Sequence, residues 1–373
     1  MKNILIVGLY SVEACPIFSL EMAKGFKKND YNVFAILPDD ICNKKDWLIE
    51  FTGEKLFFVS LGKGKNNIIK KLKKYTNILH FLIQSGPELK QKFKNVKFDI
   101  TIYTFFHRWN MIVKKYIKTT QNILILHDPL PHSDESSNRI INQKKQVQKM
   151  DKIIILSKKF KTVVKDVYNV EEKNIIYMPH GNFGYNKYRI GENKFVNNNK
   201  INFLFFGRIT SYKGLNVLLK AYYLLEQKYD NIELVIAGSG DFSDYIANYS
   251  KLKKAKLYNE YIHENEIDLF FKKSNTVVVL PYLDATQSGV IAIAIEYGIP
   301  VIASNTGGLY EQLDYGNMGI YCNPGDEYDL FEKMELIIND NNLYNLESEK
   351  MKKYSEKLEW CNIIKKLMND LIA

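Results

Sequence analysis

The sequence predicts an α/β protein made of two domains, each built on a parallel sheet covered by helices. Three observations carry this prediction. Short apolar runs alternate with helical segments along most of the chain. A polar, aperiodic stretch over residues 186–200 separates two such series and is typical of a linker. The length of 373 residues is enough for two domains with sizeable cores.

The expected strands follow one another through both domains. The first domain comprises residues 1–185, with strands near 4–7, 33–36, 57–59, 99–102, 123–126, 153–156 and 175–177. The second comprises residues 201–352, with strands near 202–206, 233–237, 256–257, 277–280, 301–303 and 319–321. Residues 353–373 are expected to form a final helix.

Composition narrows the functional classes. Residues 1–3 lead directly into an apolar strand, so we expect no signal peptide. No apolar run approaches the ~20 residues that a membrane span needs. Cysteines without CxxC spacing fit reduced thiols better than a disulfide framework or a zinc site, and the chain has four, Cys15, Cys42, Cys322 and Cys361. A cytoplasmic protein is therefore expected.

The net charge of +10 favours an anionic partner, such as nucleic acid, an anionic lipid surface or a phosphorylated substrate. Lysines gather over residues 63–97, where Ile68, Leu72, Tyr75 and Leu79 recur at helical spacing. This pattern predicts a basic amphipathic helix that lies either on an anionic membrane or over a sheet with its lysines in solvent. Few aromatics are interleaved and no recognition motif is present, which disfavours nucleic acid.

Residues 201–214 are the most informative part of the chain. The apolar run Ile201–Phe206 predicts a buried strand that ends at Gly207, where the backbone can turn sharply or be approached closely. Arg208 and Lys213 then stand five residues apart before an amphipathic helix. These features suit a bound phosphate, because a helix N-terminus presents free N–H groups and cations grip oxygens. The alternative is an ordinary loop with two solvated cations.

A second stretch, residues 277–311, has a similar design. Gln287, Ser288 and Gly289 are placed at the N-terminus of an apolar helix, and Gly298 fits the position just beyond its C-terminus. The carboxyl ends of parallel strands meet at one edge of a sheet. The two helix starts and the two cations therefore predict a single anion site.

On these residues the chain resembles the retaining nucleotide-sugar glycosyltransferases of family 4, the glycosyl transferases group 1. These enzymes have the GT-B architecture of two facing Rossmann-like domains with a C-terminal helix that crosses back to the first. The matching pieces are residues 207–208, 213–214, 235–240, 284–289 and 306–308, and more thinly Gly8, His127, Ser157 and 179–181. The version of the loop at 284–290 is similar to a branch that builds bacterial surface polysaccharides.

The resemblance implies transfer of a sugar from a UDP-sugar or GDP-sugar to a hydroxyl of a glycan or lipid-linked acceptor, with retention and without a metal. Arg208 and Lys213 would stabilise the leaving diphosphate, helped by N–H groups near residues 288–290. Fixed cations can replace a metal here, and the sequence has no Asp-x-Asp or clustered His/Asp set. His127 would hydrogen-bond the donor sugar, or it is a structural residue at a strand end.

The remaining expected site residues also follow from the resemblance. Those on the donor side are Gly8, Gly207, Gly238, Ile262 at the base, Gln287, Ser288, Gly289 and Val290. The family carries two glutamates; the first falls near Asp284 or Ala285, where Asp284 would be a shorter substitute, and the second falls at Ile293. Glu296, one turn later, either reaches a similar face or lies at the surface. His107 and His132 are acceptor-side candidates, and Trp360 marks where the chain crosses back.

Two other functions stay open at this point. A nucleotide-sugar epimerase could use the same two-domain frame without an acceptor, and an inactive nucleotide-sugar-binding protein would explain the missing second glutamate. In a front-face mechanism the leaving phosphate takes the acceptor proton and no protein base is needed. That mechanism predicts that Arg208→Ala abolishes turnover, whereas Asp128→Asn has a milder effect. A lipid-linked acceptor would also place the protein at the inner face of the plasma membrane.

Overall fold

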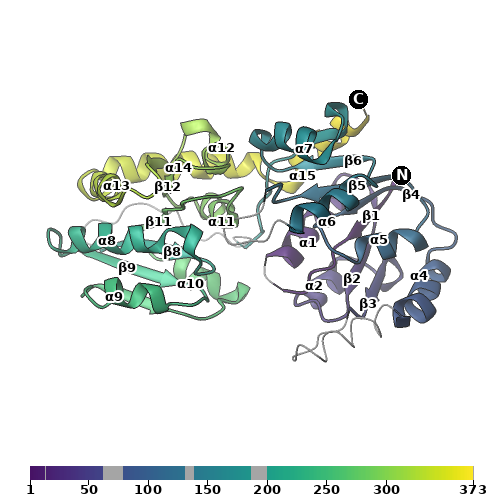
Figure 1. Ribbon diagram of the computed structural model, residues 1–373, viewed down its shortest axis with the longest axis horizontal. Coiled ribbons are helices and arrows are strands. Elements are labelled where there is room, and N and C mark those ends of the chain that lie inside the picture. The colour runs from purple at the N-terminus through teal and green to yellow at the C-terminus, as the bar shows by residue number, and fades with distance from the viewer. Residues whose placement is uncertain (13, 62–78, 131–137, 186–199, 373) are drawn as a thin grey trace.

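The computed structural model describes the chain except for residues 13, 62–78, 131–137, 186–199 and 373. Two α/β domains lie side by side and are connected at the centre of the molecule (Figure 1). The described chain ends both lie on the first domain, because the last helix returns to it (Figure 1).

The first domain holds a parallel sheet of seven strands in the order β3-β2-β1-β4-β5-β6-β7. Its strands are β1 (Asn3–Val7), β2 (Asn32–Pro38), β3 (Leu56–Val59), β4 (Phe98–Tyr103), β5 (Thr119–Leu126), β6 (Lys152–Ile155) and β7 (Ile175–Tyr177). Its helices are α1 (Cys15–Lys28), α2 (Lys44–Glu50), α4 (Gly86–Lys92), α5 (Asn110–Val113), α6 (Asn138–Val147) and α7 (Lys161–Tyr168).

The second domain holds a parallel sheet of six strands in the order β10-β9-β8-β11-β12-β13. Its strands are β8 (Ile201–Phe206), β9 (Ile232–Ala237), β10 (Ala255–Tyr258), β11 (Thr276–Leu280), β12 (Val301–Ser304) and β13 (Ile320–Cys322). Its helices are α8 (Leu215–Glu226), α9 (Ile246–Tyr249), α10 (Ile267–Phe271), α11 (Gly289–Tyr297), α12 (Leu309–Gln312), α13 (Glu327–Asn339) and α14 (Asn341–Lys357).

The central strands of both sheets are buried along all or nearly all of their length. Every residue of β8, β9 and β11 is buried, and Leu5 and Ile6 of β1 are completely inaccessible. A parallel sheet with helices on both faces leaves no side of a strand exposed, which is why these strands read as continuous apolar runs in the sequence. The predicted strand positions are confirmed to within a few residues in both domains.

Helix ends follow local chemistry. Asp326 and Asp340 cap α13 and α14 by accepting hydrogen bonds from N–H groups two and three residues ahead. Gly298 ends α11 in the left-handed region, with φ of 65°, as its sequence position predicts. Ser288 precedes the first residue of α11. The helix start that the loop at 284–290 predicts is therefore present.

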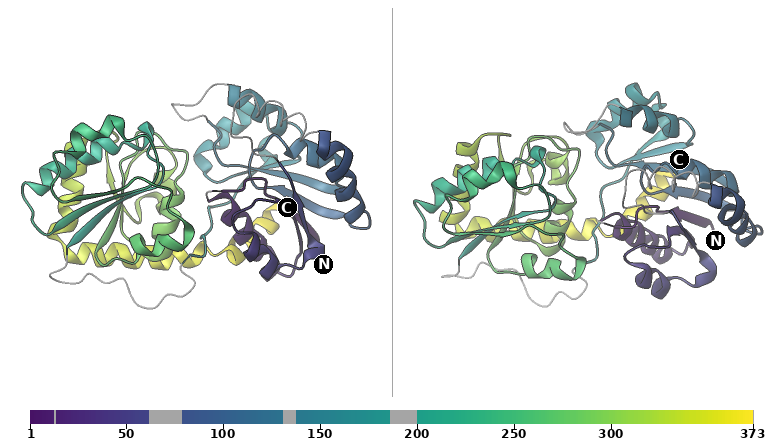
Figure 2. Two further views of the ribbon diagram at one scale, coloured as in Figure 1. Left: turned by 90° about the horizontal axis from the view of Figure 1, so that it is seen from below. Right: turned by 60° about the horizontal axis from the view of Figure 1, so that its bottom comes forward.

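The chain passes between the domains twice. Residues 178–185 lead out of the first domain after β7, and we call them the crossing segment. The chain returns at Leu358 and Glu359, between α14 and α15 (Trp360–Ile372), and α15 packs on α1 (Figure 2). The predicted helix over 353–373 is thus two helices, and the predicted domain boundary at residue 352 falls inside α14. The break is needed because the chain changes direction there to reach the first domain.

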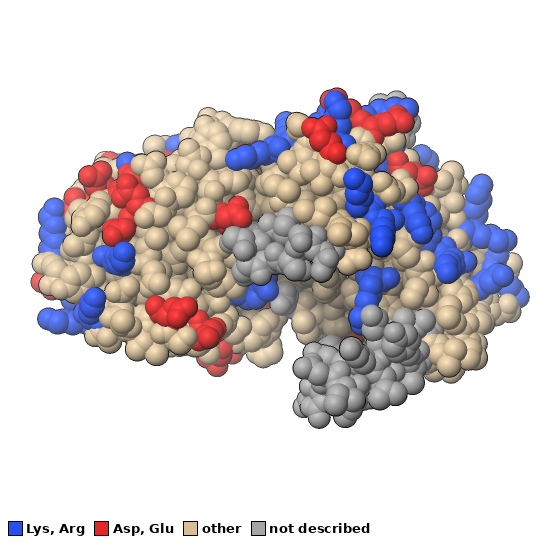
Figure 3. Space-filling view, viewed as in Figure 1, with Lys and Arg blue, Asp and Glu red and all other residues tan. Residues whose placement is uncertain are grey.

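Two expectations lie largely outside the described residues. The linker at 186–200 is described only at residue 200, and most of the basic amphipathic helix falls within 62–78. The described remainder of that basic stretch contains α4 and the exposed lysines Lys90, Lys92, Lys94 and Lys97. Lysine and arginine side chains gather over α4, α5 and α6 on this domain (Figure 3).

Candidate active site

A cavity of about 300 Å³ lies at the carboxyl edge of the second sheet, where the two domains meet. We call it the donor cavity. Its walls come from the ends of β8 and β9, the start of α11 and the crossing segment. Predicted donor-site residues that line it are Gly207, Arg208, Lys213, Gly238, Ile262, Gln287, Ser288, Gly289 and Val290. Residues far apart in the sequence thus converge as the anion-site hypothesis requires.

Glycines at the ends of β8 and β9 shape the donor cavity. Gly207 has φ of 103° and Gly238 has φ of 145°, a region that side chains rarely adopt. A Cβ on Gly238 would lie 2.1 Å from the carbonyl oxygen of Gly207, so the two turns can touch only without side chains. A Cβ on Gly207 would lie 2.8 Å from Lys213 Nζ. The ammonium group therefore stands directly beside the end of β8.

The two cations contribute differently. The Lys213 side chain is buried, with 8% of its surface exposed, and its Nζ lies 5.5 Å from the ring centre of Tyr282. Arg208 is exposed and lines both the donor cavity and the neighbouring cavity described below. Lys213 is therefore a fixed charge inside the donor cavity, while the Arg208 guanidinium stands at its mouth. Such an arrangement suits an extended anion such as a diphosphate.

The N-terminus of α11 faces the same cavity. Gln312 holds the preceding loop, because its Oε1 accepts from Ser288 N at 2.7 Å and its Nε2 donates to Ser288 O at 3.2 Å. The hydroxyls of Tyr282 and Ser288 lie 3.3 Å apart. Backbone N–H groups in the first turn of a helix have no carbonyl one turn earlier to bind. Those at Gly289 and Val290 line the cavity and are available to an anion.

A second cavity, of about 560 Å³, opens on the first-domain side of Arg208 and Gly289. We call it the acceptor-side cavity. Aromatic rings dominate its first-domain wall, and polar groups lie among them. The lining residues from the first domain include Tyr10, Phe18, Phe105, Phe106, His127, Asp128, Arg139, Gln143 and His180. The flat apolar rings with interspersed polar groups fit a sugar ring better than a wholly charged ligand.

His127 lines the acceptor-side cavity and is held by a hydrogen bond and by ring contacts. Its Nε2 lies 2.9 Å from the carbonyl oxygen of Thr104, so Nε2 carries the hydrogen and donates. Its ring stacks on Phe105 with centroids 3.9 Å apart. Burial lowers the pKa of His127 to about 3, so the imidazole is neutral and weakly basic at neutral pH. Only Nδ1 of this ring is left to accept a hydrogen bond.

Asp128 connects the two domains at the junction of the cavities. Its Oδ1 accepts from the Thr286 hydroxyl at 2.6 Å, and its Oδ2 accepts from Arg139 Nη2 at 3.1 Å. A second bridge lies nearby, where the carboxylate of Glu311 accepts from Ser157 Oγ at 2.6 Å and from Lys158 N at 2.9 Å. The first bridge places the loop before α11 against the first domain, and the second does the same for α12.

Glu264 lies at the far end of the donor cavity, close to Ile262. Burial, with a smaller contribution from Asp46, raises the pKa of its carboxyl to about 7. Its Oε1 is 3.9 Å from the Cys42 thiol of the first domain. Sequence reasoning missed Glu264, Thr286 and Glu311, because their importance depends on which first-domain residues face them.

Some predicted site residues lie elsewhere. Asp284 is exposed and lines neither cavity, because the loop turns it outward. Gly8 packs against α1, where a Cβ would lie 2.8 Å from Ser19 Oγ. His107 stands behind Tyr10, with ring centres 5.3 Å apart, and burial lowers its pKa to about 4. His132 lies outside the described residues.

Glu296 also lies away from the donor cavity, whereas Ile293 lines it. Three residues along a helix advance about 4.5 Å along the axis. This step carries Glu296 past the cavity to the crossing segment, where its carboxylate accepts from the backbone N–H groups of Phe183 and Gly184.

Two absences concern the described part of the chain. Within it, no group of three or more His, Cys, Asp or Glu residues is arranged to hold a metal ion. None of the helices described is both long and apolar enough to cross a bilayer.

Comparison with known proteins shows which proteins this chain is similar to. Residues 188–358 match the family described as glycosyl transferases group 1. An uncharacterized glycosyltransferase from Haemophilus influenzae is 27% identical over 207 residues, which cover 55% of this chain and 57% of that protein. The capsular polysaccharide biosynthesis glycosyltransferase CapM from Staphylococcus aureus is 26% identical over 160 residues, covering 41% and 42%. The matched part of this chain spans little more than half the length of the Haemophilus influenzae protein and of an uncharacterized glycosyltransferase from Methanocaldococcus jannaschii, 57% and 58% respectively.

Solved structures share the whole fold. HepE from Anabaena, in complex with UDP and glucose, superimposes with a TM-score of 0.72 at 15% identity, covering 100% of this chain and 99% of that one. Sucrose-phosphate synthase from Thermosynechococcus elongatus gives a TM-score of 0.71 at 15% identity with the same coverage. The architecture is therefore GT-B. Residues 188–358, somewhat less than half of the chain, are similar to the glycosyl transferases group 1 family.

Proposed function

We propose that this protein is a retaining glycosyltransferase that moves a sugar from a UDP-sugar or GDP-sugar to a hydroxyl of a glycan or lipid-linked acceptor. The observation that carries the proposal is the donor cavity, where a buried ammonium, a guanidinium and a helix N-terminus converge. A leaving diphosphate gains negative charge in the transition state, and fixed positive groups in a partly enclosed cavity stabilise it. HepE has been solved in complex with UDP-glucose, which supports a nucleotide-sugar donor.

The proposed mechanism needs neither a metal nor a protein base. Arg208 and Lys213 supply the positive charge that a metal ion supplies in other transferases. The bond from the anomeric carbon to the diphosphate oxygen breaks while the acceptor oxygen bonds to that carbon on the same face. The proton of the acceptor hydroxyl passes to the departing phosphate oxygen. The low pKa of His127 supports this route, because a weakly basic imidazole contributes little as a general base.

The acceptor and the location of the enzyme are further parts of the proposal. We place the acceptor hydroxyl in the acceptor-side cavity, against Tyr10 and Phe106. Surface polysaccharide synthesis is the process that we favour, and the similarity to CapM supports it. Contact with an anionic membrane would use the lysine-rich face of the first domain, where Leu82 and Ile83 are also exposed.

The test is a panel of UDP-sugars and GDP-sugars, each with and without a chelator, monitored by thermal unfolding and by release of nucleotide. A donor that binds only the native state raises the unfolding temperature as its concentration rises. We expect at least one donor to stabilise the protein and to be hydrolysed slowly without an acceptor. Stabilisation without any hydrolysis would favour an inactive binding protein, and conversion of the donor sugar without release would favour an epimerase. No stabilisation by any donor would refute the proposal.

A further inference from the structure

The helix that begins at the donor cavity contains a buried carboxylate at its other end. The sequence of α11 is apolar except for Glu296, which has only 7% of its surface exposed. An unpaired carboxylate in such surroundings costs several kcal/mol, roughly, so a buried one needs partners. Glu296 therefore has a specific role in the structure, and its partners indicate what that role is.

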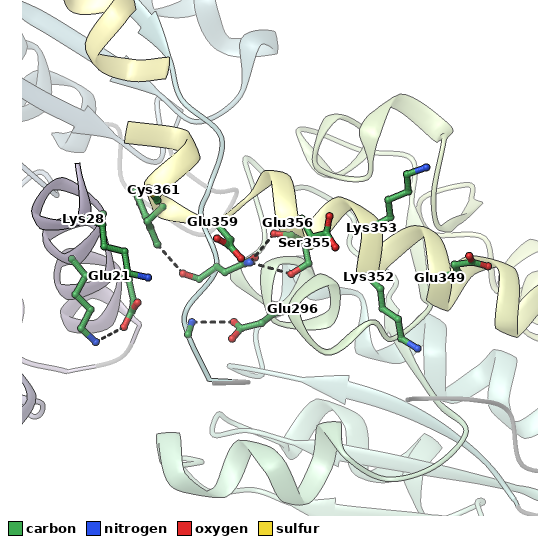
Figure 4. Close-up of a pocket in the computed structure, with 15 residues that line it drawn as sticks. Glu21, Lys28, Glu296, Glu349, Lys352, Lys353, Ser355, Glu356, Glu359 and Cys361 are labelled. Atoms are coloured by element: carbon green, nitrogen blue, oxygen red, sulfur yellow. Dashed lines mark hydrogen bonds and ion pairs between the residues drawn. The ribbon is translucent and has the colours of Figure 1, made fainter. Parts of the chain in front are cut away.

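The partners of Glu296 belong to the crossing segment. Its Oε2 accepts hydrogen bonds from Phe183 N at 3.0 Å and from Gly184 N at 3.1 Å. Figure 4 shows the carboxylate directed at this part of the backbone. The segment lies outside both sheets, so these N–H groups have no ladder partner. One side chain of the second domain thus fixes the backbone of the segment that joins the domains.

The crossing segment is also held from the first-domain side. Asn182 O accepts from Trp360 Nε1 at 2.8 Å, and Asn182 N donates to Leu358 O at 3.1 Å. Glu296, Asn182 and Trp360 line a cavity of about 620 Å³ beside the segment. The crossing segment is therefore hydrogen-bonded to the second domain through Glu296 and to the start of α15 through Trp360.

The Phe183 side chain extends from the same backbone toward the two cavities. It lines the donor cavity and the acceptor-side cavity together. A Cβ on Gly289 would lie 3.5 Å from this ring, which places it against the first turn of α11. Its ring stacks on that of Tyr185, with centroids 5.4 Å apart, and lies 4.9 Å from that of His180. The position of this ring affects how the two substrates face each other.

We propose that Glu296 is a positioning residue for sugar transfer. Its carboxylate fixes the backbone at Phe183 and Gly184, and thereby holds the Phe183 ring between donor and acceptor. Glu296 lies about 10 Å along α11 from the helix start that faces the donor. It acts through the crossing segment and does not contact either substrate. This inference rests on the proposed function.

The chain offers a matched control in Glu226. This glutamate is also buried, with 8% of its surface exposed, and lies in the second domain. Its carboxylate likewise accepts from two consecutive backbone N–H groups, those of Lys253 and Lys254, at 3.0 and 3.2 Å. It lines neither the donor cavity nor the acceptor-side cavity. Removal of either carboxylate breaks the same kind of contact, but only Glu296 is connected to Phe183.

The experiment compares Glu296→Ala with Glu226→Ala in the full chain. Amide hydrogen exchange over residues 180–185 should be faster in Glu296→Ala and unchanged in Glu226→Ala. Turnover (kcat) should fall at least about tenfold in Glu296→Ala and stay within about twofold in Glu226→Ala. Affinity for UDP or GDP should change by less than about threefold in both. Glu296→Gln should restore much of the turnover, because its amide oxygen still accepts from the two N–H groups.

Three results would overturn the inference. One is equal loss of turnover in the two alanine variants, which would make Glu296 a merely structural residue. Another is unchanged exchange over residues 180–185 in Glu296→Ala. The third is a tenfold or larger loss of nucleotide affinity, which would make Glu296 a donor contact. If the wild-type chain turned over no nucleotide sugar, the proposed function would be wrong, whereas the exchange data would still decide whether Glu296 holds the segment.

Discussion

Lys213→Met removes the buried ammonium from the donor cavity while keeping an unbranched side chain of similar length. Lys213 Nζ stands beside the end of β8 and close to Tyr282. Methionine can retain the packing of the stem in that space, so the variant should fold. The main consequence should fall on the interaction with the diphosphate, because that is the group for which the positive charge is positioned.

The size of the effect follows from the burial of the charge. A hydrogen bond to a charged group contributes about 1.5–3 kcal/mol. Two unit charges about 4 Å apart at an effective dielectric constant near 20 interact by about 4 kcal/mol. We therefore expect Lys213→Met to lose about 2–4 kcal/mol of transition-state stabilisation. At about 1.4 kcal/mol per factor of ten, kcat/KM should fall by about 30-fold to 1,000-fold.

The assay is the initial rate of UDP or GDP release at several donor concentrations, together with the unfolding temperature of each variant. Lys220→Met is the control, since Lys220 is an exposed lysine of α8 that pairs with Glu327 at 3.3 Å. It should keep the wild-type kcat/KM. The reasoning would be refuted if Lys213→Met kept kcat/KM within about threefold of wild type, or if Lys220→Met lost as much.

Three other perturbations test other parts of the site. Gly238→Ala should lower the free energy of unfolding, measured in urea, by about 2 kcal/mol or more, because its Cβ would collide with the turn at Gly207. Gly53→Ala is the control and should not cause such a loss, because its Cβ would enter open space. Glu264→Gln should raise the unfolding temperature near about pH 8 but change little near about pH 4.5. Because the pKa of Glu264 is higher in the folded state, its ionisation begins to oppose folding once the pH exceeds the unfolded-state pKa, and the full cost is reached above about pH 7. A stabilisation by Glu264→Gln that appeared only at acidic pH would contradict the raised pKa. Thr286→Val removes a hydrogen bond to the Asp128 carboxylate, which contributes about 1.5 kcal/mol, so turnover should fall about tenfold. Nucleotide affinity, measured by calorimetry, should be unchanged.

Much of the fold could be predicted from local sequence, because each buried parallel strand is an apolar run that ends in a turn. The thirteen strands in the described part of the chain lie within a few residues of the predicted positions. The tail was predicted as one helix and is divided at Leu358 and Glu359, whereas the crossing point that the resemblance placed at Trp360 coincides with the start of α15. Directly after that turn, Trp360 Nε1 donates to the carbonyl oxygen of Asn182, which is far away in the sequence.

The residues of the candidate site likewise fall into those that local sequence could predict and those that it could not. Gly207, Lys213 and Ser288 could be nominated from the sequence, because a glycine turn, a cation and a helix start each have a local signature. Asp284 and Glu296 were placed by analogy with the family, and both lie outside the donor cavity. The direction of a side chain at the end of a loop or helix depends on what packs over it, which spacing does not specify.

By itself, the sequence determined that this chain forms two α/β domains and where an anion could bind at the edge of the second. Those properties depend on periodicity, glycine placement and charge within short stretches. Only the tertiary structure decided which groups of the first domain face that edge, and that Glu296 serves the crossing segment while Glu264 and Thr286 meet the first domain. These contacts join residues more than a hundred positions apart, and packing alone brings them together.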